Sequence, residues 1–191
     1  ASSVIFNSFS RGCYAKISTL TKTKKQMPAE NTFTEYKITP FSEIAEQVRK
    51  WRKAGRSLVF TNGCFDLLHA GHIRYLQTAA AFADIFILGL NSDSSVRKLK
   101  GLRRPIMSQG DRALLLSALE AIDCVVIFDE ETPERLIETV LPDVLVKGGD
   151  YIAEDIVGYQ TVTKNGGRVE VVSFVEGKST TGIVNLIMEQ A

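Results

Sequence analysis

The chain has 191 residues, of which 45% are hydrophobic and 24% charged, and its formal net charge is +1. These values are typical of one ordinary globular domain and exclude a disordered or collagen-like chain. The near-zero net charge gives no overall field that would attract nucleic acid, and no apolar run approaches the roughly 20 residues that a membrane-spanning helix needs. We therefore expect neither a nucleic acid nor a membrane as a partner.

The N-terminal segment differs in composition from the rest of the chain. Its first 29 residues contain five basic residues and no Asp or Glu. This composition favours a leader or flexible segment over residues 1–35, ahead of a single domain over residues 36–191, with an organelle transit segment over residues 1–26 as the alternative. The three cysteines, Cys13, Cys64 and Cys124, have neither metal-site spacing nor the density of a disulfide scaffold, which indicates a reducing compartment.

From residue 39 onward, helical and strand patterns alternate. Thr39-Pro40 is a helix start signal, with Thr39 as N-cap and Pro40 at the first helical position. Ser108, followed three residues later by Asp111, resembles a capping box. In chain order, the pattern predicts helices over 40–55, 71–80, 92–99, 108–121, 133–141, 155–164 and 180–189, with strands between them over 57–62, 84–90, 124–128, 144–146 and 168–174.

These five predicted strands decide the expected fold class. Short, continuous hydrophobic strands that are separated by helices are typical of a parallel sheet covered on both faces. We therefore expect an α/β fold with a doubly wound, five-stranded parallel sheet of the Rossmann-like kind. Ligands of such sheets bind beyond the carboxyl ends of the strands, at the point where the strand order reverses. Functional residues are accordingly expected directly after strands.

The junction after the first predicted strand carries the sharpest motif. It reads TNGCFDLLHAGH over residues 61–72 and holds both histidines of the chain, His69 and His72. Gly71 allows close backbone approach at a helix start, where free N–H groups and the helix dipole favour a phosphate. Either imidazole alone would more often cap a loop or pack on a helix face. The pairing of the two at this junction favours phosphate binding instead.

Two later junctions carry further candidate anion sites. Lys147-Gly148-Gly149-Asp150 follows the fourth strand, where glycines beside a lysine can bring backbone and ammonium groups onto an anion. The other reading of this segment is a turn with a solvated lysine. Lys178-Ser179-Thr180-Thr181 precedes the last helix and offers hydroxyl and N–H groups, although the segment taken alone favours an ordinary helix cap.

The motifs together resemble a known family. The 61–72 string is similar to the His-x-Gly-His signature of the nucleotidyltransferase superfamily, and residues 178–183 are similar to its Ser-Thr motif, although Val184 stands where many relatives have arginine. Further matching segments make residues 41–188 resemble heptose-1-phosphate adenylyltransferase, a bacterial enzyme of lipopolysaccharide synthesis. These segments are Asn91-Ser92-Asp93, Lys100-Gly101, Arg103-Arg104-Pro105, residues 119–123 and residues 145–151.

The resemblance implies that AMP is transferred from ATP to D-glycero-β-D-manno-heptose 1-phosphate, giving ADP-heptose and pyrophosphate. It implies catalytic roles for His69, His72 and Lys147, Mg²⁺ held mainly by substrate phosphates, a homodimer and a bacterial cytoplasmic location. The expected nucleotide-binding residues are Thr61, Asn62, Gly63, Cys64, Phe65, Gly71, Asn91, Asp93, Arg112, Lys178, Ser179, Thr180 and Thr181. The expected substrate-binding residues are Asp66, Gly148, Gly149 and Asp150.

Two other functions remain open at this point. One is a CTP-dependent cytidylyltransferase that acts on glycerol 3-phosphate or a phosphorylated amino alcohol. The other is a nucleotide-sensing module that binds without turnover, which the intact pair of histidines disfavours because a sensor needs no transition-state contacts. Arg103 and Arg104 either cover phosphates from a loop or are solvated surface residues.

Overall fold

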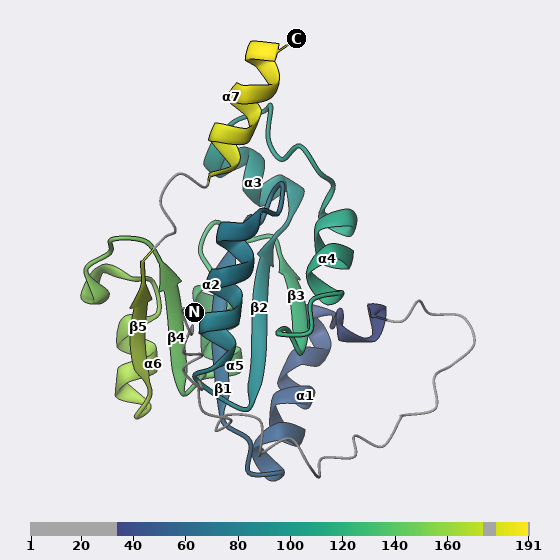
Figure 1. Cartoon of the computed structure of the whole chain (residues 1–191). Coiled ribbons are helices and arrows are strands. Elements are labelled where there is room, and N and C mark those ends of the chain that lie inside the picture. The colour runs from purple at the N-terminus through teal and green to yellow at the C-terminus, as the bar shows by residue number, and fades with distance from the viewer. Residues whose placement is uncertain (1–33, 174–178, 191) are drawn as a thin grey trace, which may run out of the picture. The chain divides into compact units, whose positions relative to one another are not determined.

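The computed structural model describes residues 34–173 and 179–190. The expected leader therefore lies outside the described residues except for its last two positions, and so does Lys178. Figure 1 shows the described elements. The strands are β1 (Leu58–Gly63), β2 (Ile85–Asn91), β3 (Cys124–Phe128), β4 (Val144–Gly148) and β5 (Arg168–Val172). The helices are α1 (Phe41–Lys53), α2 (Ala70–Ala80), α3 (Asp93–Lys100), α4 (Gln109–Ser117), α5 (Glu134–Val140), α6 (Tyr159–Lys164) and α7 (Thr180–Gln190), with 3₁₀ turns η1 (Glu35–Lys37) and η2 (Ala153–Asp155).

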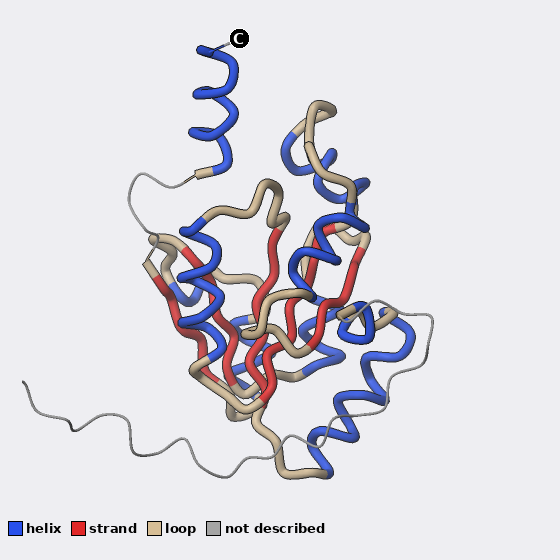
Figure 2. The backbone as a smooth tube through the Cα atoms, turned by 45° about the vertical axis from the view of Figure 1, so that its right-hand side comes forward, coloured by secondary structure: helices blue, strands red, loops and turns tan. Residues whose placement is uncertain are grey.

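The five strands form one parallel sheet in the order β3-β2-β1-β4-β5, which confirms the predicted fold class. The chain moves outward from β1 through β2 to β3, then returns to the other side of β1 for β4 and β5. The strand order thus reverses between β1 and β4, which makes the crevice beside their carboxyl ends the expected ligand site. The strands appear as the central layer of Figure 2.

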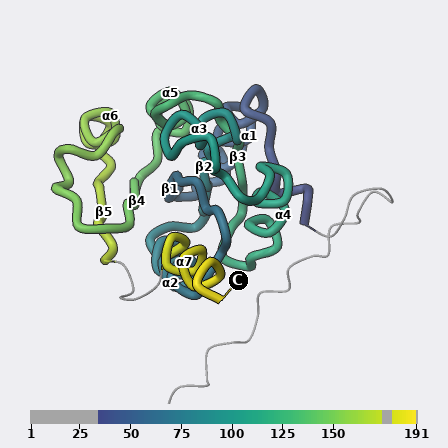
Figure 3. The backbone as a smooth tube through the Cα atoms, turned by 90° about the horizontal axis from the view of Figure 1, so that it is seen from above, coloured from purple at the N-terminus to yellow at the C-terminus, as the bar shows by residue number. Residues whose placement is uncertain are grey.

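Helices cover both faces of the sheet because strand side chains alternate between two hydrophobic clusters. Leu58 and Phe60 of β1 join a cluster with residues of α1 and α5, whereas Val59 joins a cluster with residues of α2 and α4. A view from above in Figure 3 places α1 and α5 on one side of the strands and α2 and α4 on the other. Full burial of side chains such as Phe60 and Leu76 stabilises the fold by about 1.5–3 kcal/mol each.

The prediction of one helix over residues 155–164 was wrong in its first half. The 3₁₀ turn η2 ends at Asp155, residues 156–158 form a turn, and α6 begins only at Tyr159. Gly158 separates the two with a positive φ of 92°. A Cβ at this position would lie 2.6 Å from Cδ1 of Ile137 on α5, so glycine is required both by the backbone conformation and by this close approach.

Two predicted helix ends also differ from the structure. Thr39 does not cap α1, because its N–H donates to Val125 O and its Oγ1 accepts a bond from Cys124 Sγ, so the helix begins at Phe41. Helix α4 ends at Ser117 rather than near residue 121, since the chain then turns to bury Ile122 and enter β3. At its start, Ser108 caps the helix by accepting from the N–H of Asp111, as predicted.

Among the described residues, no helix has both the length and the apolar character that crossing a membrane requires.

Candidate functional site

The two histidines stand together where the chain leaves β1 and enters α2. His69 is the N-cap residue of α2 and His72 lies in its first turn. Their rings stack with centroids 3.9 Å apart, and the ring of Phe65 tilts against His72 at 5.5 Å. The backbone N–H of His69 points to Nδ1 of His72 at 3.4 Å, which places the proton of the neutral His72 ring on Nε2. Nε2 is therefore a hydrogen-bond donor.

Burial keeps His72 neutral at physiological pH. Its pKa falls from 6.5 to about 4, first because burial removes water from the ring, then because His69 and Lys100 disfavour a further positive charge nearby. A neutral donor at a helix start can approach a phosphate without the strong hydration of an ammonium group. A bound phosphate would favour the charged form of the ring, so negative charge beside His72 would raise its pKa.

The strained turn before the histidines fixes their position. Phe65 and Leu67 have positive φ values of 44° and 51°, a conformation that costs about 1–2 kcal/mol for a residue with a side chain. Asp66 lies between them and is buried. Its carboxylate accepts hydrogen bonds from the N–H groups of Ile106 and Met107 at 2.8 and 3.0 Å, and Arg104 Nε lies 2.9 Å from its Oδ2. These contacts hold the turn against its strain.

Lys147 and Asn62 meet across the switch point of the sheet. Nζ of Lys147 on β4 donates to Oδ1 of Asn62 on β1 at 3.2 Å. Burial lowers the pKa of Lys147 from 10.5. Beneath this pair, Tyr75 hydrogen-bonds Thr61 at 2.6 Å and donates to Val146 O, and burial raises its pKa to about 12. The lysine is thus placed by packing at the crevice where ligands of such sheets bind.

A cavity of about 540 Å³ opens at this point. Its walls combine the end of β1, the end of β4 and the C-terminal turn of α3, and its polar groups include two lysines and two carboxylates. The lining residues are Asn62, Gly63, Cys64, Phe65, His72, Tyr75, Asn91, Leu99, Lys100, Glu131, Thr132, Pro133, Lys147, Gly148, Tyr151, Asp155, Ile156 and Val157. A cavity of this size can hold a small phosphorylated molecule or a nucleoside.

A second cavity of about 480 Å³ lies beside His69. It is lined by His69, Ser179 and residues of α7, whereas His72 lines the first cavity. Ser179 caps α7 by accepting from the N–H of Gly182, and Thr180 Oγ1 donates to the backbone oxygen of Asp66 at 2.7 Å. The stacked imidazoles therefore stand between two cavities, each of which contains a helix end or a lysine suited to anions.

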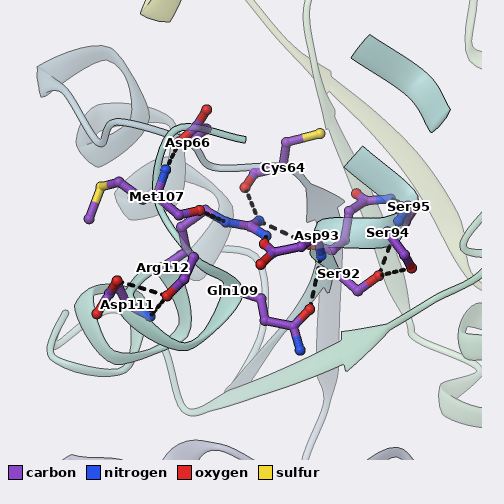
Figure 4. Close-up of polar contacts among 12 residues, drawn as sticks. Cys64, Asp66, Ser92, Asp93, Ser94, Ser95, Met107, Gln109, Asp111 and Arg112 are labelled. Carbon is purple, nitrogen blue, oxygen red and sulfur yellow. Dashed lines mark hydrogen bonds and ion pairs between the residues drawn. The ribbon is translucent and has the colours of Figure 1, made fainter. Parts of the chain in front are cut away.

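Some expected site residues have protein partners of their own. Thr61 is buried under Tyr75, and the carboxylate of Asp66 is engaged by the 104–107 loop. Arg112 is fully buried and pairs with Asp93 at 2.7 Å, as Figure 4 shows. The arrangement places these side chains behind the cavity walls rather than on them.

The remaining expected residues do not share one environment. Gly71 and Gly149 are buried, Gly71 in the first turn of α2 and Gly149 with its N–H donated to Val172 O. Asp150 and Thr181 are exposed and do not line either cavity. Their assignment to substrate and nucleotide remains a prediction.

Lys100 is not among the residues predicted for the site, although Lys100-Gly101 is one of the segments that resemble the family. In the structure Lys100 lines the first cavity and acts electrostatically on His72. Glu131, Tyr151 and Asp155 line the same cavity and were also missed. Basic residues are common at helix C-termini, so the sequence alone does not mark Lys100 as a site residue. Its closeness to the histidines is visible only in the structure.

Comparisons with known proteins agree with this geometry. Residues 60–184 match the cytidylyltransferase-like family. The chain belongs to that family. It is 55% identical over 154 residues to the bifunctional protein HldE of Geotalea uraniireducens, covering 81% of this chain and 31% of the relative. It is 48% identical over 180 residues to the HldE of Trichlorobacter lovleyi, covering 92% of this chain and 37% of the relative.

A solved structure shows the same fold. The lipopolysaccharide core biosynthesis protein from Thermoplasma volcanium matches with a TM-score of 0.54 at 25% identity, covering 65% of this chain and all of that one. This cytidylyltransferase-like chain spans about a third of the length of the curated relatives it matches. The His-x-Gly-His segment and β4 both lie inside the matched region, so the family resemblance predicted from the motifs is confirmed.

Proposed function

We propose that the chain transfers the adenylyl group of ATP to D-glycero-β-D-manno-heptose 1-phosphate, giving ADP-heptose and pyrophosphate. The observation that carries the proposal is the stacked pair His69 and His72 between two cavities, with lysines in one and the start of α7 in the other. ATP and the heptose phosphate are chosen because the whole set of motifs resembles heptose-1-phosphate adenylyltransferase. Similarity to HldE proteins and to a lipopolysaccharide core biosynthesis protein supports the choice.

In the proposed reaction, a phosphate oxygen of the sugar phosphate attacks the α-phosphorus of ATP in line with the departing pyrophosphate. Such transfers depend on alignment and charge neutralisation rather than on a covalent intermediate. Lys147 and Lys100 face the first cavity and would neutralise the attacking phosphate. The imidazoles would donate to oxygens of the α- and β-phosphates, and the start of α7 at Ser179 would accept the pyrophosphate.

Mg²⁺ is part of this proposal and would be held mainly by the phosphates. The carboxylates of Asp66 and Asp93 are engaged by Arg104 and Arg112, and the described residues contain no group of three or more His, Cys, Asp or Glu that could hold a metal ion. A hard cation prefers oxygen anions and water, so its ligands would come mainly from the substrate phosphates. When bound, the ion would withdraw charge from the phosphate oxygens. A homodimer and a bacterial cytoplasmic location, both implied by the family resemblance, complete the proposal.

The test is a matrix of turnover assays that records pyrophosphate release. Each nucleoside triphosphate is paired with heptose 1-phosphate, with other sugar 1-phosphates and with glycerol 3-phosphate, in the presence of Mg²⁺. The proposal expects ATP and the heptose phosphate to give the highest kcat/KM. Preference for CTP with glycerol 3-phosphate would establish the cytidylyltransferase alternative. Calorimetric ATP binding without turnover of any pair would establish a sensor.

A further inference from the structure

Arg112 joins four segments of the chain behind the candidate site. It lies in α4 and is fully buried. Its Nε donates to Met107 O at 3.1 Å, one terminal nitrogen donates to Cys64 O at 2.6 Å and Asn91 O at 2.9 Å, and the other meets Asp93 Oδ1 at 2.7 Å. Figure 4 shows the guanidinium at the centre of these contacts. Each of its three nitrogens thus has a protein acceptor.

The four segments form or position the walls of the first cavity. Cys64 belongs to the turn that leads from β1 to the histidines, and Asn91 ends β2 and lines the first cavity. Asp93 begins α3, the helix that carries Lys100 at its other end. Met107 belongs to the loop that the carboxylate of Asp66 holds by its N–H groups. Arg112 therefore contacts this loop, the β1–α2 turn and both elements that lead to Lys100.

The arrangement of these acceptors requires the guanidinium group of arginine, and another cationic side chain cannot replace it. A buried charge is costly unless it is paired and hydrogen-bonded, and Arg112 has one carboxylate and three carbonyl oxygens around it. A guanidinium presents five donors in a fixed plane and can reach all four at once. The ammonium of lysine has three donors about a single point and cannot span this set.

We propose that Arg112 is a positioning residue of the nucleotidyltransferase reaction, which fixes the β1–α2 turn and the start of α3 and touches neither substrate. It replaces the nucleotide-binding role that the sequence suggested for Arg112 and Asp93. The kinetic consequences of this proposal rest on the proposed function. Its structural consequence for the histidines is independent of that function. Because the turn contains two residues with positive φ, loss of the carbonyl contacts at Cys64 and Met107 releases a strained segment.

The test compares Arg112→Lys with Arg49→Lys, a surface control whose arginine side chain is 74% exposed and pairs with Glu46 on the same helix. Arg112→Lys is expected to lower kcat by about 10²-fold, as for a displacement of reacting groups by an ångström, while KM for ATP changes less than about 3-fold. Arg49→Lys is expected to change neither. A large rise in the KM for ATP with unchanged kcat would overturn the proposal and make Arg112 a nucleotide contact.

A spectroscopic measurement keeps the test independent of activity. The chain has two histidines, so the ring signals of His69 and His72 can be followed by NMR through a pH titration. In Arg112→Lys the pKa of His72 is expected to rise from about 4 towards 6.5, because the loosened turn admits water. Identical histidine titrations in the folded variant and the wild type would overturn the positioning role, even if the wild type turns over no sugar phosphate.

A second variant covers the case in which Arg112→Lys does not fold. Asp93→Asn keeps the size of the side chain and leaves the three carbonyl contacts of Arg112 in place. It should lower kcat in the same direction but less, roughly 10-fold, because only one of four acceptors is weakened. An Asp93→Asn enzyme with raised KM for ATP and unchanged kcat would contradict the proposal.

Discussion

The backbone N–H of His69 points to Nδ1 of His72, and the two rings stack 3.9 Å apart. The position of the pair and the tautomer of His72 are therefore set by the start of α2 itself rather than by a ligand. Because the pKa of His72 falls to about 4, the ring enters the reaction as a neutral donor. A donor that is in place before negative charge develops on the phosphate oxygens stabilises the transition state more than the ground state, which is what catalysis requires.

Removal of either donor should therefore reduce turnover without unfolding the protein. His69→Ala and His72→Ala are each expected to lower kcat by about 10²–10³, the effect of losing one preorganised transition-state donor. Steady-state kinetics on variants checked by circular dichroism would measure this. Near-normal turnover by a folded double variant would refute the assignment of both histidines.

The lowered pKa of His72 also predicts how stability changes with pH. Between about pH 6.5 and 4 the unfolded chain carries a proton on this ring and the native protein does not, so the free energy of unfolding falls as pH falls through that window. This stability is fully present above pH 6.5. The lowered pKa values of Asp84 and Asp129 act in the same direction, because the stabilisation from these carboxylates is lost as pH falls below about 5.

Urea unfolding at several values between pH 7.5 and 4.5 would test this dependence. His72→Gln should show a shallower loss of unfolding free energy with acid than the wild type, because glutamine has no proton to gain. Equal slopes for the two proteins would mean that His72 is not the group responsible.

The sequence predicted the sheet and the histidine site because both depend on local patterns. Continuous apolar strands and the 61–72 motif can each be recognised within about a dozen residues of sequence. The break at Gly158 was missed because the packing that requires glycine there involves Ile137, which is close in space but distant in sequence. The contacts of Arg112 could not be predicted for a similar reason, since its acceptors come from the β1–α2 turn, the β2–α3 junction and the loop before α4.

Asp66 offers a test of the contacts that hold the β1–α2 turn. Asp66→Asn removes the charge that faces Arg104 and one of the two acceptors for the N–H groups of Ile106 and Met107. We expect the free energy of unfolding to fall by about 2–4 kcal/mol, as for loss of a buried charged partner. Asp150→Asn, at an exposed position, is the control and should stay within about 0.5 kcal/mol of the wild type. Equal stabilities of the two variants would show that the turn does not depend on the carboxylate.

A substitution of Lys147 tests whether this residue binds the acceptor phosphate or is an ordinary surface lysine. Its Nζ lies at the switch point, bound to Asn62 Oδ1, and burial lowers its pKa, so it is already partly desolvated before a substrate arrives. A charge-assisted contact from such a group strengthens as the α-phosphorus becomes pentacovalent. Lys147→Met should therefore lower kcat/KM for the sugar phosphate by roughly 10²-fold or more.

Binding of ATP alone should suffer much less from Lys147→Met, because the proposal places the pyrophosphate part of ATP at the second cavity, which His69 and the start of α7 line and Lys147 does not. Lys53→Met, an exposed change at the end of α1, is the matched control and should leave both quantities unchanged. The measurements are steady-state kinetics with each substrate varied and calorimetric titration with ATP. Equal losses for both substrates would place Lys147 on the nucleotide, and kinetics that match the Lys53 variant would leave it without a role in the reaction.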